Sequence, residues 1–394
     1  MDIGVIGAGV AGLASSIALH NFGHNITLYE KNSHISSFGA GVQLSSNGCK
    51  VLDYLGVLSE VRDLSVIPEN IIFFDAERNK KIGSIPLGNT ALERYGYNFL
   101  LIHRFDLVNV LNSKANELGI YPKFNSNVSI RNLHNDYVDI DCDSTCKRFP
   151  LVIAADGIKS VTRKKFFNNE EPKFLKQIAY RAITSSKNVP EFLRKKNINV
   201  FLGSKKHLVS YPICSGALIN FVFCKDKFEW LDNEWSIKAT EGEIHKDFFS
   251  FPIINELNNI FDDVYKWGLF GYKPLNKWNK KNLMIVGDAC HPFLPYLAQG
   301  TNQALEDAFG LTKFLFDDKK IKNQFNFDKF TNFRKRRISR VYKASGKNAV
   351  LFHLKNHFIK IIRNYFFSFF SKFFPKFLLS KFDWLYGFDF DKKF

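Results

Sequence analysis

The sequence lacks the features that mark several common classes of protein. None of its six cysteines forms the CxxC pair of a zinc or dithiol site, so we expect no metal site and mostly structural, reduced thiols. The first residues, MDIGVIGAGVAG, enter a strand-like run without the basic and apolar regions of a signal peptide. These absences predict a cytoplasmic protein without a bound metal.

Acidic residues are scarce relative to basic ones, and the formal net charge is +17. Such a charge raises the question of a nucleic-acid partner, but no RNA-binding or helix-turn-helix signature accompanies it. The chain has 42 Phe and only 2 Met, together with many Lys and Asn, which indicates a compositional bias of the whole genome. We therefore expect no nucleic-acid partner, in a chain whose 45% hydrophobic and 24% charged residues are typical of globular proteins.

The amino-terminal residues carry a dinucleotide-binding fingerprint. A short apolar run leads into Gly7, Gly9 and Gly12 in GxGxxG spacing, a helical stretch follows, and a second apolar run ends at Glu30. Gly7 permits the tight turn after the strand, Gly9 lets the backbone approach a pyrophosphate, and Gly12 lets the helix pack closely on the sheet. The flanking strands and the closing acid predict a βαβ unit.

This fingerprint predicts where a dinucleotide would bind but not which one. Its pyrophosphate would lie on the helix start at Val10 and Ala11, where free N–H groups and the helix dipole favour an anion. Glu30 is placed to accept hydrogen bonds from a ribose diol, and Lys31 follows it in the predicted site. No second GxGxxG follows a strand, so the fingerprint leaves FAD and NAD both open.

Four further stretches resemble one family. They are SFGAGVQLSSNGCKVLDYLGV (37–57), LIHRFDLVNVL (101–111), VIAADGIKSVTRK (152–164) and GDACHPFLPYLAQGTNQALEDA (287–308). In this order they resemble the single-component FAD monooxygenases of the salicylate hydroxylase and 3-hydroxybenzoate 6-hydroxylase type, including the family's DG and GD motifs. The resemblance covers nearly the whole chain, because FDWLYGFD (382–389) also resembles the family's closing segment.

The resemblance implies one non-covalently bound FAD. The residues it adds to the fingerprint are Gly41, Val42, Arg104, Val128, Asp156, Asp288, Pro295, Gly300, Thr301 and Asn302. Leu283 to Val286 would form a core strand with Asp288 at its end, beside the ribityl chain. The helix beginning at Gly300 would point its N–H groups at the N1–C2=O edge of the flavin. Glu306 and Asp307, in the first turns of this helix, either contribute to the flavin site or only stabilise the N-terminal end of the helix.

The implied reaction uses NADH or NADPH, O2 and a small aromatic substrate, such as a phenol or a hydroxybenzoate. In this family the reduced flavin forms a C4a-hydroperoxide that transfers OH to the ring. GSKKHLVSYPI resembles the family stretch with H-x-x-x-Y-P order, which makes His207 the candidate base and Tyr211 a substrate-orienting residue. Four residues along a strand is roughly 13 Å, so either the twist or a bend near Pro212 shortens the gap, or the two residues act at different points of the substrate. Arg181 would hold a carboxylate or form a salt bridge.

The predicted fold class is α/β, with an inserted antiparallel β-sheet substrate domain and a C-terminal helical tail. The Rossmann-like FAD-binding domain would comprise 1–70, 97–175 and 276–345. The substrate domain would comprise 71–96 and 176–275, and the tail 346–394. Oligomeric state stays open between monomer and homodimer.

The tail is rich in Phe, Lys and Arg, and its longest uncharged stretch, Asn364 to Ser371, is far too short to span a membrane. We expect a long helix that packs back on the FAD-binding domain. The alternative is an amphipathic helix lying on an anionic membrane, which would make the protein peripheral.

Four other classes of protein share part of these motifs or of the nucleotide-binding fingerprint, and the sequence weighs against three of them. A membrane-associated hydroxylase of the ubiquinone pathway shares these motifs, but its last helix typically reads closer to NLGLRD than to QALEDA. A flavin halogenase would need a WxWxIP element, which is absent. A plain NAD dehydrogenase would leave the DG and GD motifs without a role. A non-hydroxylating FAD oxidoreductase, or an FAD-binding scaffold without activity, stays possible on sequence alone.

Overall fold

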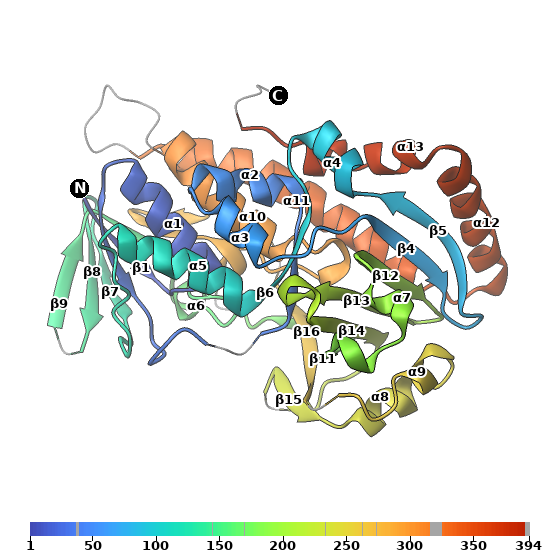
Figure 1. Cartoon of the computed structure of the whole chain (residues 1–394). Helices are drawn as coiled ribbons and strands as arrows, with labels where there is room; N and C mark the ends of the chain where they lie inside the picture. Colours follow the sequence, from blue (N-terminus) through green and yellow to red (C-terminus); the bar gives the residue numbers. More distant parts are fainter. Residues whose placement is uncertain are drawn as a thin grey trace.

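The computed structural model describes residues 1–36, 39–143, 145–168, 170–232, 234–261, 263–272, 274–315 and 325–390. Ser37 and Phe38, which open the second motif stretch, lie outside this set. Two main sheets form the molecule, one at the dinucleotide-binding half and one at the opposite half, with helices around both (Figure 1). The α/β class and the C-terminal helices are as predicted.

A five-stranded sheet, ordered β17–β18–β10–β1–β2, forms the first half. Its strands are β1 (Asp2–Ile6), β2 (Asn25–Tyr29), β10 (Leu151–Ala154), β17 (Asn279–Lys280) and β18 (Leu283–Ile285). All neighbours are parallel except the edge pair β17–β18. The central strands are apolar runs because both of their faces are buried. The predicted core strand at 283–286 is therefore confirmed as β18.

Helices cover this sheet and supply its binding edge. They are α1 (Val10–Asn21), α5 (Arg104–Glu117), α6 (Val161–Phe166), α10 (Gly300–Gly310) and α11 (Phe327–Phe352). Helix α1 ends before Gly23, whose φ of +92° suits a residue without a side chain. The helix predicted to begin at Gly300 is confirmed as α10, which continues into a π-helical turn over Leu311–Leu315.

An eight-stranded sheet, ordered β15–β16–β11–β14–β13–β12–β4–β5, forms the second half. Its strands are β4 (Asn70–Asp75), β5 (Lys80–Pro86), β11 (Lys173–Ser185), β12 (Asn197–Leu202), β13 (Lys206–Ile213), β14 (Leu218–Asp226), β15 (Ser236–Ala239) and β16 (Val264–Gly271). Every neighbouring pair is antiparallel except β4–β12, which is parallel and joins the two segments of chain that build the sheet. One face packs through Phe221 and Phe223 on α8 (Glu241–Phe248) and α9 (Ile253–Glu256).

Smaller elements complete the two halves. Strands β3 (Gly41–Leu44) and β6 (Leu100–His103) form an antiparallel pair, and a three-stranded meander consists of β7 (Ser129–Leu133), β8 (Val138–Cys142) and β9 (Thr145–Phe149). The remaining short helices are α2 (Ser46–Tyr54), α3 (Leu58–Asp63), α4 (Gly88–Tyr95) and α7 (Glu191–Arg194).

The C-terminal region differs from the prediction in two respects. Helix α11 runs unbroken from Phe327 to Phe352, so the boundary expected at 345 falls inside a helix. The tail after it, α12 (His357–Phe373), α13 (Pro375–Ser380) and α14 (Asp383–Tyr386), was expected to pack on the FAD-binding half. Instead α12 and α13 lie along β5 at the outer edge of the large sheet (Figure 1), where the Ser371 hydroxyl accepts the Ser84 N–H at 2.7 Å. The remaining domain boundaries stay predictions.

Candidate functional site

The fingerprint glycines occupy positions at which a side chain would collide with the backbone or enter open space. Gly7 has φ +99°, and a Cβ there would lie 2.5 Å from the Ala155 carbonyl oxygen. A Cβ on Gly12 would lie 1.8 Å from the Gly7 oxygen, which shows how closely α1 approaches the turn. A Cβ on Gly9 would meet nothing within 4 Å. The turn therefore leaves free space at the helix start, the place at which a pyrophosphate binds in this motif.

A hollow of about 250 Å³ opens beside this turn. Among its lining residues are Gly9, Glu30, Lys31, Val128, Asp156 and Lys165. The Glu30 carboxylate accepts the N–H groups of Ala8 at 2.8 Å and of Asn32 at 2.9 Å, so its position is fixed by the backbone. With Gly7, six predicted cofactor residues from four parts of the chain thus share one cavity, which fits the nucleotide end of a dinucleotide. The ribose contact of Glu30 stays a prediction.

The DG and GD motifs are linked through Arg163 of α6 by hydrogen bonds. Asp156 accepts the Ser160 hydroxyl at 2.6 Å and the Thr162 N–H at 3.1 Å, which fixes the start of α6. From that helix, the buried Arg163 guanidinium donates to the carbonyl oxygens of Cys290 at 2.6 Å and Ala289 at 3.2 Å. Arg163 therefore holds the loop that follows Asp288, a link between distant motifs that their sequence order did not reveal.

Asp288 stands at the end of β18 and beside the start of α10, as predicted. A Cβ on Gly300 would lie 4.0 Å from its Oδ1. The residue is exposed to solvent, although many protein atoms lie around its carboxylate. Burial raises the pKa of the Asp288 carboxyl, and the charges of His291 and Arg104 oppose that shift. With Pro295 in the turn just before α10, these residues surround the place predicted for the flavin.

The Asn302 side chain links α10 to β3 and the residue after it by hydrogen bonds. Its Oδ1 accepts the Ser45 N–H at 3.0 Å, and its Nδ2 donates to the carbonyl oxygens of Gln43 at 3.0 Å and Ala298 at 2.8 Å. These bonds occupy the amide, so a contact of Asn302 with a cofactor would have to come from its backbone. Thr301 precedes it in the same half-buried first turn. These hydrogen bonds keep Gly41 and Val42 of β3 close to the start of α10.

Glu306 and Asp307 belong to a buried ionic network. Arg334 of α11 donates to Asp307 Oδ1 at 2.8 Å and to Glu306 Oε2 at 2.5 Å, and Arg337 donates to Glu306 Oε2 at 2.5 Å. Asp307 also accepts the Gly287 N–H at 2.9 Å. Burial alone would raise the pKa of both carboxyls, but the arginines, together with His291 at Asp307, hold each pKa below its ordinary value. These acids therefore fix the GD loop and α11, and they do not face the cofactor site.

Tyr211, Asn220 and Arg181 come together on the inner face of the large sheet. A Cβ on Gly41 would lie 2.6 Å from Tyr211 Cε2, and Asn220 Oδ1 accepts the Gly41 N–H at 2.7 Å. The buried Asn220 Nδ2 and the Arg181 Nε have no hydrogen-bond partner among the described residues. The Arg181 guanidinium lies 5.4 Å from the centre of the Trp267 ring.

Asn220 was missed at the level of sequence. The signal was present, because an amide inside the apolar run INFVFC has no ordinary reason to be buried. Its position opposite Tyr211 on the next strand comes from the register of β13 with β14, which the sequence did not specify.

His207 lies on the same strand as Tyr211 but in different surroundings. It is 2% exposed, and its Nδ1 is 2.7 Å from His353 Nε2, while His353 Nδ1 is 2.6 Å from Asp226 Oδ1. Burial and the neighbouring His353 lower the pKa of His207 well below 6.5. Strand β13 keeps an unbroken register with both neighbours, so no bend brings His207 to Tyr211.

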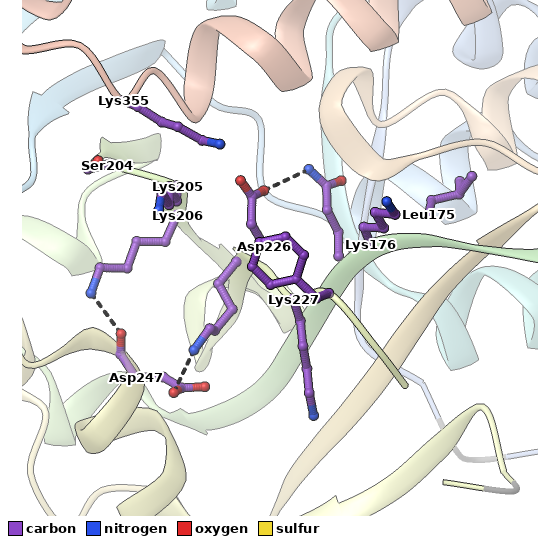
Figure 2. Close-up of a pocket in the computed structure, with 12 residues that line it drawn as sticks. Leu175, Lys176, Ser204, Lys205, Lys206, Asp226, Lys227, Asp247 and Lys355 are labelled. Atoms are coloured by element: carbon purple, nitrogen blue, oxygen red, sulfur yellow. Dashed lines mark hydrogen bonds and ion pairs between the residues drawn. The ribbon is translucent and has the colours of Figure 1, made fainter. Parts of the chain in front are cut away.

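We call the hydrogen-bonded series His207, His353 and Asp226 the histidine chain, and it ends at a basic surface hollow. This hollow, of about 520 Å³, is lined by Lys176, Lys205, Lys206, Lys225, Lys227 and Lys355, with Asp226 and Asp247 (Figure 2). The Asp247 carboxylate forms an ion pair with the Lys225 ammonium at 2.6 Å. The Asp247 carbonyl oxygen accepts a hydrogen bond from the Lys206 ammonium at 2.7 Å. Asp226, in contrast, both lines the hollow and binds His353. The chain from Asp226 to His207 therefore connects this surface with the protein interior.

Comparison with known proteins agrees with this geometry. Residues 1–343 match the family model described as FAD binding domain. A 3-hydroxybenzoate 6-hydroxylase from Polaromonas naphthalenivorans (strain CJ2) is 27% identical over 390 residues, covering 97% of this chain and 95% of that protein. A 6-hydroxynicotinate 3-monooxygenase from Bordetella bronchiseptica is 28% identical and covers 89% of this chain and 91% of that protein.

Solved structures resemble the fold over almost its whole length. A salicylate hydroxylase in a substrate complex has a TM-score of 0.80 at 22% identity, covering 99% of this chain and 96% of that chain. HpxO of Klebsiella pneumoniae, complexed with FAD and uric acid, has a TM-score of 0.81 at 20% identity, covering 93% and 92%. At these identities the likeness concerns the fold.

Proposed function

The chain belongs to the FAD binding domain family of FAD-dependent aromatic hydroxylases, and we propose that it hydroxylates a small phenolic carboxylic acid with electrons from NADH or NADPH. The observation that carries the choice of an acid is Arg181, a cation on the inner face of the large sheet whose Nε has no partner among the described residues. An Arg guanidinium binds a carboxylate more strongly than it binds a neutral group. The substrate would also be a compound with an electron-rich ring.

The described residues fit FAD. Three features offer it room or polar groups: the open space at Gly9, the hollow bounded by Glu30 and Asp156, and the exposed Asp288 before the start of α10. Glu30 would bind the ribose end and Asp288 the ribityl end, while the first turn of α10 would supply N–H groups to the ring. When bound, FAD supplies the oxidation–reduction chemistry that activates O2.

Tyr211, Asn220 and Arg181 would position the substrate against that ring. Burial raises the pKa of Tyr211 above its ordinary value, so its hydroxyl stays protonated and can donate a hydrogen bond. The free Asn220 Nδ2 is a second donor on the same face. Two neutral donors and one cation suit an anionic aromatic acid, because each would form a hydrogen bond to oxygen.

His207 would accept the phenol proton, at the other end of the substrate from Tyr211. An ionised Asp226 accepts the N–H of His353 Nδ1, which leaves His353 Nε2 as an acceptor for the Nδ1–H of His207. The second nitrogen of His207 is then free of its proton and can act as a base. Because its pKa is lowered, His207 remains neutral at pH 7. The chain would pass the proton towards the basic hollow at Asp226.

A substrate panel with the purified holoprotein tests this proposal. Salicylate and 3-hydroxybenzoate should stimulate NADH or NADPH consumption more than phenol does. Arg181→Gln should raise KM for the acids about ten- to a hundredfold, the worth of a charged hydrogen bond, and leave phenol almost unchanged. Arg340→Gln is the matched control, since Arg340 also stacks on a tryptophan, at 4.2 Å from the Trp384 ring centre. Equal effects of Arg181→Gln on acids and phenol would contradict the proposal.

A further inference from the structure

Helix α12 carries its large apolar side chains on the side that faces away from the protein. The exposed ones are Phe358, Ile359, Ile361, Ile362, Tyr365, Phe366, Phe369 and Phe373, with exposed fractions between 44% and 77%. We call these residues the outer face of α12. In Figure 1 the helix lies at the periphery, outside β5. An apolar surface of this extent on a single helix marks an interaction site more often than an ordinary surface.

The inner side of the same helix is largely polar. Lys360 is buried and its Nζ lies 2.6 Å from Glu77 Oε2, Asn364 Nδ2 donates to Asp75 Oδ2 at 3.0 Å, and the Ser371 hydroxyl donates to the Ser84 oxygen at 3.0 Å. These residues recur at the spacing of one helix face. The helix is thus attached to β4, β5 and the turn between them by these polar groups and by Phe367, whose ring packs on Phe73 at 4.8 Å between centroids. Most of its other large apolar side chains stay exposed.

The charges around the outer face have one sign. No Asp or Glu occurs between Asp328 and Asp383. Lys355, Lys372, Lys376 and Lys381 are exposed around α12 and α13. The Lys381 ammonium lies 4.0 Å from the centre of the Phe377 ring, so its stem follows the apolar surface while its charge stays at the rim.

This combination selects among possible partners. A second copy of the chain would bring lysine against lysine across a two-fold interface, which opposes association. An anionic lipid surface offers hydrocarbon to the rings and phosphate to the lysines. Within the described residues, no helix has the length and apolarity needed to cross a bilayer. With 17 residues, α12 would instead lie along the interface over about 25 Å.

We propose that the outer face of α12 docks the protein on anionic lipid bilayers. The helix axis lies parallel to the membrane plane, with the aromatic rings among the acyl chains and the lysines at the phosphates. This surface is separate from the predicted flavin and substrate sites, so the inference goes beyond the proposed function and does not depend on it.

Vesicle binding by the FAD-loaded full chain tests the docking. The protein should float with vesicles of phosphatidylglycerol and phosphatidylcholine and should bind pure phosphatidylcholine much more weakly. Ile362→Gln with Phe366→Gln should weaken binding at least about tenfold, since each removes buried apolar area. Lys372→Gln, Lys376→Gln and Lys381→Gln should each weaken it about fivefold at low salt. Phe228→Gln with Leu231→Gln, at residues 86% and 83% exposed elsewhere, is the matched control and should bind as wild type does.

Two further measurements separate docking from self-association. Phe369→Trp should show tryptophan fluorescence that brominated lipids quench, whereas a dimer contact would leave it unquenched. Sedimentation velocity should give the same oligomeric state for wild type and the Ile362→Gln, Phe366→Gln variant, and FAD content should confirm that both are folded. The proposal is overturned if wild type ignores anionic vesicles, if it binds neutral ones equally, or if this variant dissolves a dimer while vesicle binding is unchanged.

Discussion

Three carboxylates in the stretch 287–308 have opposite environments, although a short sequence contains them all. Glu306 and Asp307 are 0% exposed and bind Arg334 and Arg337 of α11. Asp288 is exposed, and the charges that act on its carboxylate, among them those of His291 and Arg104, form no ion pair with it in the described part of the chain. The first two are closed within the protein, and the third is open to a ligand.

This difference separates a structural acid from a binding acid. A fully paired buried carboxylate has spent its hydrogen-bonding capacity on the fold, and removing its partner leaves a buried charge. An open carboxylate costs the free protein little when it is removed, but its ligand loses a charged hydrogen bond. The closed acids should therefore affect stability, and the open acid should affect cofactor affinity.

The largest effect is expected from opening the closed network. Glu306→Ala leaves Arg337 without its carboxylate in a buried position, and the free energy of unfolding should fall by about 3–5 kcal/mol. Denaturant unfolding of the FAD-free protein measures it. Glu256→Ala, at an exposed residue of α9, should change the same quantity by less than about 0.5 kcal/mol. A Glu306→Ala protein as stable as this control would mean that the network contributes nothing.

The histidine chain is a case between closed and open. His207→Ala should lower the rate of hydroxylation about a hundredfold, the contribution of a general base, while flavin reduction by NAD(P)H survives. Reducing equivalents would then leave as H2O2, so the product formed per NAD(P)H consumed should drop. If coupling and rate stay at wild-type values, His207 is only a core residue of the strand.

Removal of the Asp288 carboxylate should have a moderate effect on the affinity for FAD. Asp288→Ala should weaken FAD binding about ten- to a hundredfold by removing a charged hydrogen bond to the ribityl chain. The apoprotein should unfold at the wild-type denaturant concentration, in contrast to Glu306→Ala. Titration of the apoprotein with FAD measures the affinity, and unchanged binding would remove this strand end from the flavin site.

A smaller effect is expected on the pH dependence of the free energy of unfolding, because His207 is buried. Its folded pKa lies well below 6.5, so below pH 6.5 the unfolded chain takes up a proton that the folded protein excludes. Stability that is fully present above pH 6.5 is therefore lost as the pH falls, by about 1.4 kcal/mol per pH unit. His207→Gln should remove this part of the slope. A constant stability difference between the two proteins from pH 7 to pH 5 would contradict the assignment.

The local motifs were predictable because each is a short-range rule. A buried strand, a glycine turn and a helix start follow one another over residues 2–10 and, with a longer loop, over residues 283–300, and both arrangements are as predicted. The partners of Glu306 were not predictable, because Arg337 is 31 residues away on another helix and only packing brings the two together.

Helix α12 shows a second limit of sequence patterns. Its apolar periodicity predicts an amphipathic helix, but the pattern does not state which face meets the protein. The polar partners on β4, β5 and the turn between them, Glu77 among them, decide that the face with Lys360, Asn364 and Ser371 turns inwards. The expectation that the tail packs on the FAD-binding half was therefore wrong for α12 and α13, whereas Phe388 and Phe390 at the end of the tail do pack in the core of that half.

Oxygen transfer from O2 to the ring of a phenolic acid is the central claim, and isotope labelling tests it directly. The FAD-loaded protein, NADH or NADPH and the best acid from the substrate panel are incubated under 18O2, and the product is analysed by mass spectrometry. The account predicts a hydroxylated acid that carries one 18O atom. NAD(P)H consumption with H2O2 as the sole oxygen product, or a hydroxyl group derived from water, would contradict it.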